Sequence, residues 1–329
     1  MKNTLIKISL ITALALVGAV AKENTHTLKF PQTIKIDGIA LNPEGIEYDK
    51  NDHTFLLSSL NASPIVKVNL DGTYKPFTSG EKFPLSTAGL QIDNKRNRLL
   101  VAGFNGMELM DKDPKTKGVS FLRIYNLKTG LLEKEINLSS LAPKADAYFA
   151  NDIAVDTQGN AYITDWYAGL IYKVDLAGKA SIFWKNDSGI AGGPNGIDFH
   201  PDGYLLVSVI KVDDKGIYAT HGLVKVPLDN PKSASTVKIT DKAFAGFDGM
   251  VITPKGKVMG VTNNGKTGGG NTLVELTSKD NWKSANVTQS KAITTSTTLA
   301  LTQTDASYVI NQDFSDNFKK SWVIEKVGF

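Results

Sequence analysis

The sequence predicts an all-β protein folded as a six-bladed β-propeller. One pattern recurs along the chain: a small or polar residue, usually followed by Gly or Asp, then an apolar run, a turn and a second β-rich run. The copies lie roughly 45 to 60 residues apart, which suits one propeller blade each. They begin at Pro43, Ala88, Asn151, Pro194 and Asp248, with a degenerate sixth copy at Thr297.

Further β-rich runs follow the first two in each copy, such as PIVKVNLDG with TYKPFTSG and GLIYKVDLAG with KASIFWK. Each run ends in a Gly or Asp turn, so four strands per copy are expected. The last copy has only WVIEKVGF left for its later strands. We therefore expect the segment THTLKFPQTIKI, near the N-terminus, to complete the last blade and close the ring, which removes an exposed sheet edge. A two-sheet sandwich is the alternative, although its strand units are usually shorter.

The first 21 residues differ from the rest of the chain. Lys2 and Lys7 precede an almost wholly apolar run from Ile8 to Val20, and Ala19-Val20-Ala21 has the small-x-small pattern of a signal peptidase site. The apolar run is short for a membrane span. The sequence therefore predicts a signal peptide at 1–21, a single propeller domain at 22–329, and a periplasmic or secreted protein.

The composition narrows the classes of partner. The chain is 41% hydrophobic and 21% charged, which is ordinary for a globular protein, and it contains no cysteine for a disulfide or a lipid anchor. The formal net charge is +4, and it falls further once Lys2 and Lys7 are removed. A nearly neutral domain argues against nucleic acid or a membrane surface as a partner. A small-molecule substrate is the expected partner, with a protein, peptide or glycan as the alternative. The oligomeric state is open.

Polar residues open most of the repeats. In a propeller the innermost strand of each blade runs along the central channel, so equivalent residues at the start of these strands face one another. These positions carry Glu44, Ala88, Asn151, Asn195, Asp248 and Thr297. Two carboxylates and two amides in this set predict an oxygen-rich cation site, for which Ca²⁺ is the favoured ion and Zn²⁺, Mn²⁺ or Mg²⁺ are alternatives. The competing interpretation is that these residues cap local turns.

These motifs resemble those of the senescence marker protein/gluconolactonase family and, more distantly, the paraoxonases and diisopropylfluorophosphatase. The resemblance rests on PEGIEYD, ANDIAVD, PNGIDFHPDG and FDGMVITPKG, in the blade order of that family, and covers the chain from about residue 27 to its end. It implies a calcium-dependent six-bladed hydrolase with Glu44, Asn151, Asn195 and Asp248 as metal ligands. It also implies Asp248 as general base or nucleophile.

Two functions follow as hypotheses. The first is an exported metal-dependent hydrolase of a lactone or ester, with organophosphorus compounds as a further substrate class. The second is a non-catalytic propeller that binds a protein, peptide or glycan on its rim, with or without a structural cation. The carboxylate-bearing quartet favours the hydrolase, because a binding propeller has no need for Glu44 and Asp248 together at the channel.

Three further residues are candidates for substrate contacts. They are His221 and Met107, both expected in long loops, and Trp166 at the end of the strand ITDW. Asp165 in the same motif is expected to make a structural contact. Asp152 follows Asn151 as in the paraoxonases, where such a pair also serves a second calcium. Gly45 stands where the acidic partner of that second site is expected, so the motif is incomplete.

Overall fold

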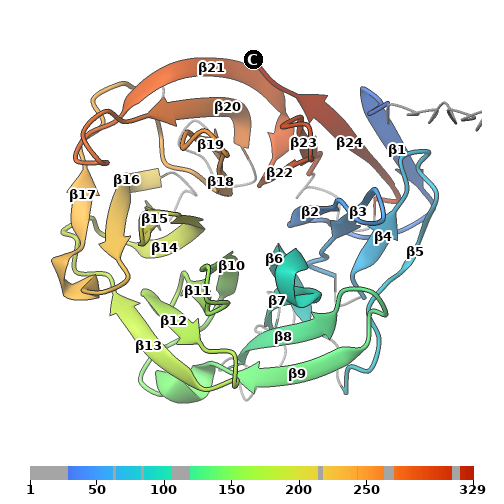
Figure 1. Cartoon of the computed structure of the whole chain (residues 1–329), viewed down its shortest axis with the longest axis horizontal. Helices are drawn as coiled ribbons and strands as arrows, with labels where there is room; N and C mark the ends of the chain where they lie inside the picture. Colours follow the sequence, from blue (N-terminus) through green and yellow to red (C-terminus); the bar gives the residue numbers. More distant parts are fainter. Residues whose placement is uncertain are drawn as a thin grey trace, which may run out of the picture. The chain divides into compact units, whose positions relative to one another are not determined.

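The computed structural model describes residues 29–61, 64–82, 85–105, 119–213, 218–242, 244–262, 270–312 and 319–329. Within them, the segment Pro31–Phe329 forms six four-stranded antiparallel sheets arranged as a ring (Figure 1). The predicted six-bladed propeller is confirmed. The predicted signal peptide lies outside the described residues. No helix in the described ranges is long and apolar enough to cross a membrane.

The strands of each blade follow one another from the centre of the ring outward. Blade 1 consists of β2 (Ile46–Asp49), β3 (Thr54–Leu57), β4 (Val66–Val68) and β5 (Tyr74–Pro76). Blade 2 consists of β6 (Ser86–Asp93), β7 (Arg98–Phe104), β8 (Ser120–Asn126) and β9 (Leu132–Asn137). Blade 3 consists of β10 (Ala150–Val155), β11 (Ala161–Asp165), β12 (Leu170–Val174) and β13 (Ala180–Lys185).

The second half of the ring repeats this arrangement. Blade 4 consists of β14 (Gly193–His200), β15 (Tyr204–Val212), β16 (Tyr218–Pro227) and β17 (Ser235–Val237). Blade 5 consists of β18 (Met250–Ile252), β19 (Val258–Thr262), β20 (Gly270–Thr277) and β21 (Asn286–Ser296). Blade 6 consists of β22 (Leu299–Leu301), β23 (Ser307–Ile310), β24 (Ser321–Val327) and β1 (Thr33–Asp37). Three short 3₁₀ helices lie between strands in the described part of the chain: η1 (Asn94–Arg96), η3 (Ser139–Leu141) and η4 (Pro231–Ser233).

The ring closes between the two ends of the chain. Strand β1 pairs antiparallel with β24, with Thr33 opposite Glu325 and Asp37 opposite Ser321. Ile34 and Ile36 are buried in this blade. The indole N–H of the buried Trp322 donates to the carbonyl of Ile39 at 2.9 Å, which fixes the chain where it leaves β1. The N-terminal segment therefore completes the last blade, as the sequence predicts.

The hydrophobic core consists of layers between neighbouring blades. Between blades 2 and 3, for example, Leu100 and Leu122 pack in one cluster with Ile163 and Tyr172. The middle strands are buried on both faces, which is why β3 (TFLL) and β7 (RLLVAGF) are continuous apolar runs rather than alternating patterns. Packing on both sides leaves the innermost strands in fixed positions around the channel.

One expected loop is shorter than the sequence analysis suggests. Strand β15 extends to Val212 and β16 begins at Tyr218, so His221 lies within a strand rather than in a long connection. The apolar and β-branched residues on either side of the turn extend the hairpin. The other expected long loop, which contains Met107, falls on residues 106–118, outside the described residues.

Candidate functional site

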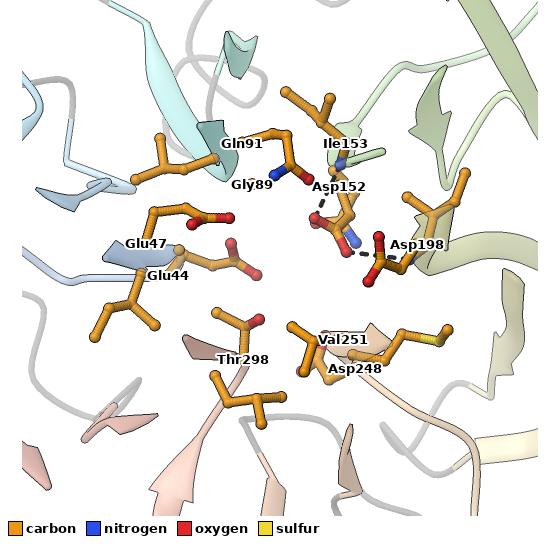
Figure 2. A pocket seen from close by; sticks show the side chains of 18 of the residues that line it. Glu44, Glu47, Gly89, Gln91, Asp152, Ile153, Asp198, Asp248, Val251 and Thr298 are labelled. Carbon is orange, nitrogen blue, oxygen red and sulfur yellow. Dashed lines mark hydrogen bonds between the residues drawn. The ribbon is translucent and has the colours of Figure 1, made fainter. Parts of the chain in front are cut away.

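The innermost strands of all six blades surround one cavity of about 100 Å³. Figure 2 shows Glu44, Asp152 and Asp248 converging on it from three different blades. Asn151 and Asn195 also line the cavity, and each is only 6% exposed. The four residues predicted as metal ligands therefore lie together, and no described residue that lines the cavity is Lys, Arg or His.

A β-bulge turns the polar residues of two blades out of the ladder. In β10 the pairing passes from Ala150 directly to Ile153 and skips Asn151 and Asp152. In β14 it passes from Pro194 to Ile197 and skips Asn195. A bulge leaves two residues opposite one and redirects their side chains. The bulges place both asparagine side chains at the channel although each lies within a strand.

Glycine follows Glu44, Asn195 and Asp248 because the next blade passes very close at this point. A Cβ on Gly45 would lie closer than 3.0 Å to the carbonyl oxygen of Ala88, and a Cβ on Gly196 would lie equally close to the carbonyl oxygen of Asp248. The E-G, N-G and D-G pairs of the sequence thus combine a donor side chain with the space that the neighbouring strand requires.

Hydrogen bonds connect three of the four side chains. The Asn151 amide donates to the amide oxygen of Asn195, and the Asn195 amide donates to Oδ1 of Asp248 at 3.2 Å. The Glu44 backbone is linked to the residue after Asp248 through Thr297, which donates its hydroxyl to the Glu44 carbonyl at 2.5 Å and accepts the Gly249 N–H at 2.6 Å. Asn151, Asn195 and Asp248 form a continuous row across blades 3, 4 and 5.

Burial raises the pKa of both carboxylates among the four predicted ligands. Burial raises the pKa of Glu44 well above its ordinary value, and the charges of Asp248 and Asp152 raise it further. Burial also raises the pKa of Asp248 to about 7, while the hydrogen bond from Asn195 acts in the opposite direction. In the absence of a cation Asp248 therefore binds a proton near neutral pH.

The cavity contains a second set of polar residues that was not predicted from the sequence. Glu47 and Asp198 come three residues after Glu44 and Asn195, and Gln91 holds the same place after Ala88 (Figure 2). Burial raises the pKa of Glu47 well above its ordinary value, with further contributions from Asp198 and Asp152. The signal was present in the sequence: an acidic or amide residue recurs at one position of strands that are otherwise apolar.

The donor set suits a hard cation. Glu44 and Asp248 supply carboxylate oxygens, and Asn151 and Asn195 supply neutral amide oxygens, which are the groups that Ca²⁺ prefers. Five carboxylates border the cavity with no basic side chain among its described lining residues, so a divalent cation would relieve their mutual repulsion. No three His, Cys, Asp or Glu side chains in the described part of the chain converge on a single metal position. A cation in this cavity would therefore need the amide oxygens of Asn151 and Asn195 in its ligand set.

Two of the three predicted substrate contacts, His221 and Trp166, do not line the cavity. The ring of His221 packs edge-on against Phe244 at a centroid distance of 5.9 Å, and His221 does not line the cavity. The indole N–H of Trp166 donates to the carbonyl of Ile210 at 3.0 Å, and its ring stacks on that of Tyr167. Met107 lies outside the described residues. Asp165 accepts hydrogen bonds from the backbone N–H groups of Phe149 and Ala168, which is the structural contact that the sequence analysis expects.

The fold and the cavity define a six-bladed propeller with an acidic central channel. The sequence model of the SMP-30/Gluconolactonase/LRE-like region matches residues 42–307, and the chain belongs to this family. Comparison with curated protein sequences gave no match.

Solved structures with the same fold cover nearly the whole chain. The Malassezia sympodialis allergen Mala s 1 is 20% identical over 91% of this chain and 97% of its own, with a TM-score of 0.71. A gluconolactonase from Xanthomonas campestris is 14% identical over 90% of this chain and 89% of its own, with a TM-score of 0.58. The aldose sugar dehydrogenase of Streptomyces coelicolor is 13% identical over 91% of this chain and 100% of its own, with a TM-score of 0.54. Because these proteins differ in function, the likeness concerns the fold, and function must be argued from the site.

Proposed function

We propose that the protein is an exported, calcium-dependent hydrolase of a lactone or ester, with organophosphorus esters as a further substrate class. The proposal rests on one observation above all: two carboxylates and two amides from four blades border one cavity that has no basic side chain among its described lining residues. Membership of the SMP-30/Gluconolactonase/LRE-like family supports it.

Glu44, Asn151, Asn195 and Asp248 would hold the cation. When bound, the cation supplies Lewis-acid polarisation of the carbonyl or phosphoryl oxygen, which is worth several kcal/mol in reactions of this kind. The two amides hold the row in place through the hydrogen bonds from Asn151 to Asn195 and from Asn195 to Asp248. They add donor oxygens without adding further negative charge.

Asp248 is assigned the proton transfer. Its carboxylate is buried at the channel and is oriented by the Asn195 amide. For a lactone, Asp248 accepts a proton from the attacking water as the new C–O bond forms. The ring C–O bond then breaks, and the proton passes to the departing alkoxide, so that lactone and water give one hydroxy acid. Direct attack by the carboxylate is the alternative route, with an acyl-enzyme that water hydrolyses.

The test is a calcium titration of metal-stripped protein lacking residues 1–21, with hydrolysis of a panel of small lactones, aryl esters and organophosphorus esters. Glu44→Gln and Asp248→Asn are the test variants. Asp156→Asn is the matched control, because that buried carboxylate accepts the Asn160 N–H at 2.9 Å within its own blade and does not line the cavity. Calcium-dependent turnover that only the test variants lose supports the proposal.

Two other results would contradict it. Calcium binding without hydrolysis of any of the three substrate classes would leave a cation site in a binding propeller. Absence of calcium binding would mean that the polar row only caps its strands. Export is checked separately by fractionating cells that express the full chain and determining the N-terminal residue of the mature protein, which we expect to be Lys22.

A further inference from the structure

The innermost strand of each blade is a sheet edge. The N–H groups on its unpaired side therefore have no neighbouring strand in the same sheet that could accept their hydrogen bonds. Buried backbone N–H groups nevertheless need acceptors. In blades 4 and 5, two of these groups are satisfied by carboxylates from the preceding blade. These carboxylates belong to Asp152 and Asp198, neither of which is in the predicted metal quartet.

Asp152 connects blade 3 to blade 4. It occupies the bulge position where blades 1, 2, 4 and 5 carry glycine. Its Oδ1 accepts the N–H of Ile153 in its own strand at 2.9 Å, and its Oδ2 accepts the N–H of Ile197 in the next blade at 3.1 Å. The connection therefore runs between the residue after Asn151 and the end of the bulge that contains Asn195.

Asp198 makes the same connection from blade 4 to blade 5. Its Oδ1 accepts the N–H of Phe199 in its own strand at 2.7 Å, and its Oδ2 accepts the N–H of Ile252 in blade 5 at 2.6 Å. Ile252 ends β18, the short strand that follows Asp248. In each carboxylate, one oxygen thus accepts a hydrogen bond from its own blade and the other accepts one from the next blade.

Three other pairs of neighbouring blades are joined by uncharged groups. Gly249 in blade 5 donates its N–H to the carbonyl of Thr297 at 2.6 Å, and the Thr297 hydroxyl donates to the carbonyl of Glu44 in blade 1. Thr87 in blade 2 donates its N–H to the carbonyl of Ser59 in blade 1 at 2.8 Å. The two connections made by carboxylates that line the cavity join the blades that carry Asn151, Asn195 and Asp248.

We propose that Asp152 and Asp198 are positioning residues, whose inter-blade hydrogen bonds set the spacing of Asn151, Asn195 and Asp248 and thereby the affinity of the site for calcium. The inference rests on the proposed function, since it concerns the same cation. Hydrogen-bonding groups behind metal ligands typically change metal affinity by 10- to 100-fold when they are replaced. We expect losses in that range.

The experiment is isothermal titration of metal-stripped protein with CaCl₂ at two ionic strengths. Asp198→Asn keeps the size of the side chain but removes its negative charge. It also removes one of the two acceptor oxygens, because an amide has only one. Asp198→Glu keeps the charge and moves the acceptor oxygens by one methylene. Positioning predicts that both variants bind calcium at least about tenfold more weakly than the wild type. We expect the same of Asp152→Asn, while Asp156→Asn, the control within one blade, binds as the wild type does.

The outcomes separate positioning from simple attraction. If Asp198→Glu binds calcium like the wild type while Asp198→Asn loses affinity mainly at low salt, the carboxylate acts by its charge and the inference is overturned. Wild-type affinity in all variants also overturns it. If the wild type itself binds no calcium, the proposed function fails instead.

A further variant covers the case in which the aspartate variants do not fold, as judged by circular dichroism. Ile252→Pro removes the N–H donor and leaves the carboxylate in place, and proline is tolerated where a strand N–H points away from its ladder. It should weaken calcium binding to a similar extent. Wild-type affinity in this variant would contradict the role of the connection from Asp198 to blade 5.

Discussion

At the scale of single residues, Asp248 has three properties that suit it to proton transfer. It borders the channel, its Oδ1 accepts a hydrogen bond from Asn195, and burial raises its pKa to about 7. Replacement by Asn preserves the shape and removes both the charge and the proton acceptor. We expect Asp248→Asn to lower kcat for the best substrate of the panel by about 10³-fold, within the range for loss of a general base. Steady-state kinetics at saturating calcium measures this, with circular dichroism as the check on folding. Unaltered turnover would remove Asp248 from the mechanism.

Gly196 shows how backbone space at one residue supports the site. A Cβ there would collide with the carbonyl oxygen of Asp248, which is backbone and cannot rotate away. Gly196→Ala should therefore cost about 1–3 kcal/mol in the free energy of unfolding. It should also weaken calcium binding, because it displaces Asp248. Urea denaturation and calorimetry measure the two effects. Gly328→Ala is the control, since nothing lies within 4 Å of a Cβ at that position, and an equal loss in both variants would contradict the explanation.

At the scale of elements, the repeat was sufficient to predict the blades. Each copy contributes an apolar run, a turn and a second run, and these became pairs such as β2 with β3 and β10 with β11. The shortage of strands in the last copy predicted the pairing of β1 with β24. The bulges were not predicted, because they depend on how two strands align. His221 was expected in a loop because the charged residues and glycine of VDDKG interrupt the apolar run that precedes it.

The candidate site could likewise be predicted only where its residues follow a pattern within one repeat. Glu44, Asn151, Asn195 and Asp248 could be chosen because they open their repeats and match short motifs. Asp152 and Asp198 carry hydrogen bonds to a neighbouring blade, and no pattern within one repeat reveals such a partner. The structure was needed to show that these two carboxylates join the blades that carry the predicted ligands.

Strand β1 provides a prediction at this scale. Removing residues through Asp37 deletes the five residues paired with β24 and uncovers Trp322, which is fully buried in the intact blade. Loss of Ile34 and Ile36 from the core alone should cost about 3 kcal/mol or more, at 1.5–3 kcal/mol for each side chain. We expect a clearly lower Tm than for a chain beginning at Lys29, measured by calorimetry. Equal Tm values would mean that β1 contributes nothing to ring closure.

At the scale of the whole molecule, the charged side chains are distributed unevenly. The formal net charge is +4, yet the channel is bordered by five carboxylates. The arginines are paired elsewhere: Arg96 and Arg98 bind Asp93, and Arg123 binds Glu135. No basic side chain is among the described residues that line the channel, so we expect compensation there from protons or from a cation. Stability should depend on pH and calcium together.

The sign of this dependence follows from the direction of the pKa shifts. Burial raises the pKa of Asp152 and Asp248 to about 7, and that of Asp198 to about 6. These groups bind more protons in the folded than in the unfolded chain between about pH 4 and pH 7. Their contribution to stability is fully present below the unfolded-state pKa and is lost as the pH rises through the folded-state pKa. Calcium-free protein should accordingly have a lower Tm at pH 8 than at pH 6.

Calcium should reverse this trend, because it binds the deprotonated carboxylates and competes with protons. At saturating calcium we expect the Tm at pH 8 to equal or exceed the Tm at pH 6. We also expect calcium binding near pH 6.5 to release protons, which is detectable because the binding enthalpy then depends on the buffer. The range stops at pH 6 because ion-paired Asp93, whose pKa is lowered, acts in the opposite sense in acid. Glu44→Gln should abolish the calcium effect and retain most of the pH effect. A Tm that is independent of pH without calcium would show that the channel carboxylates are already neutralised within the protein, which would remove the electrostatic reason for a cation there.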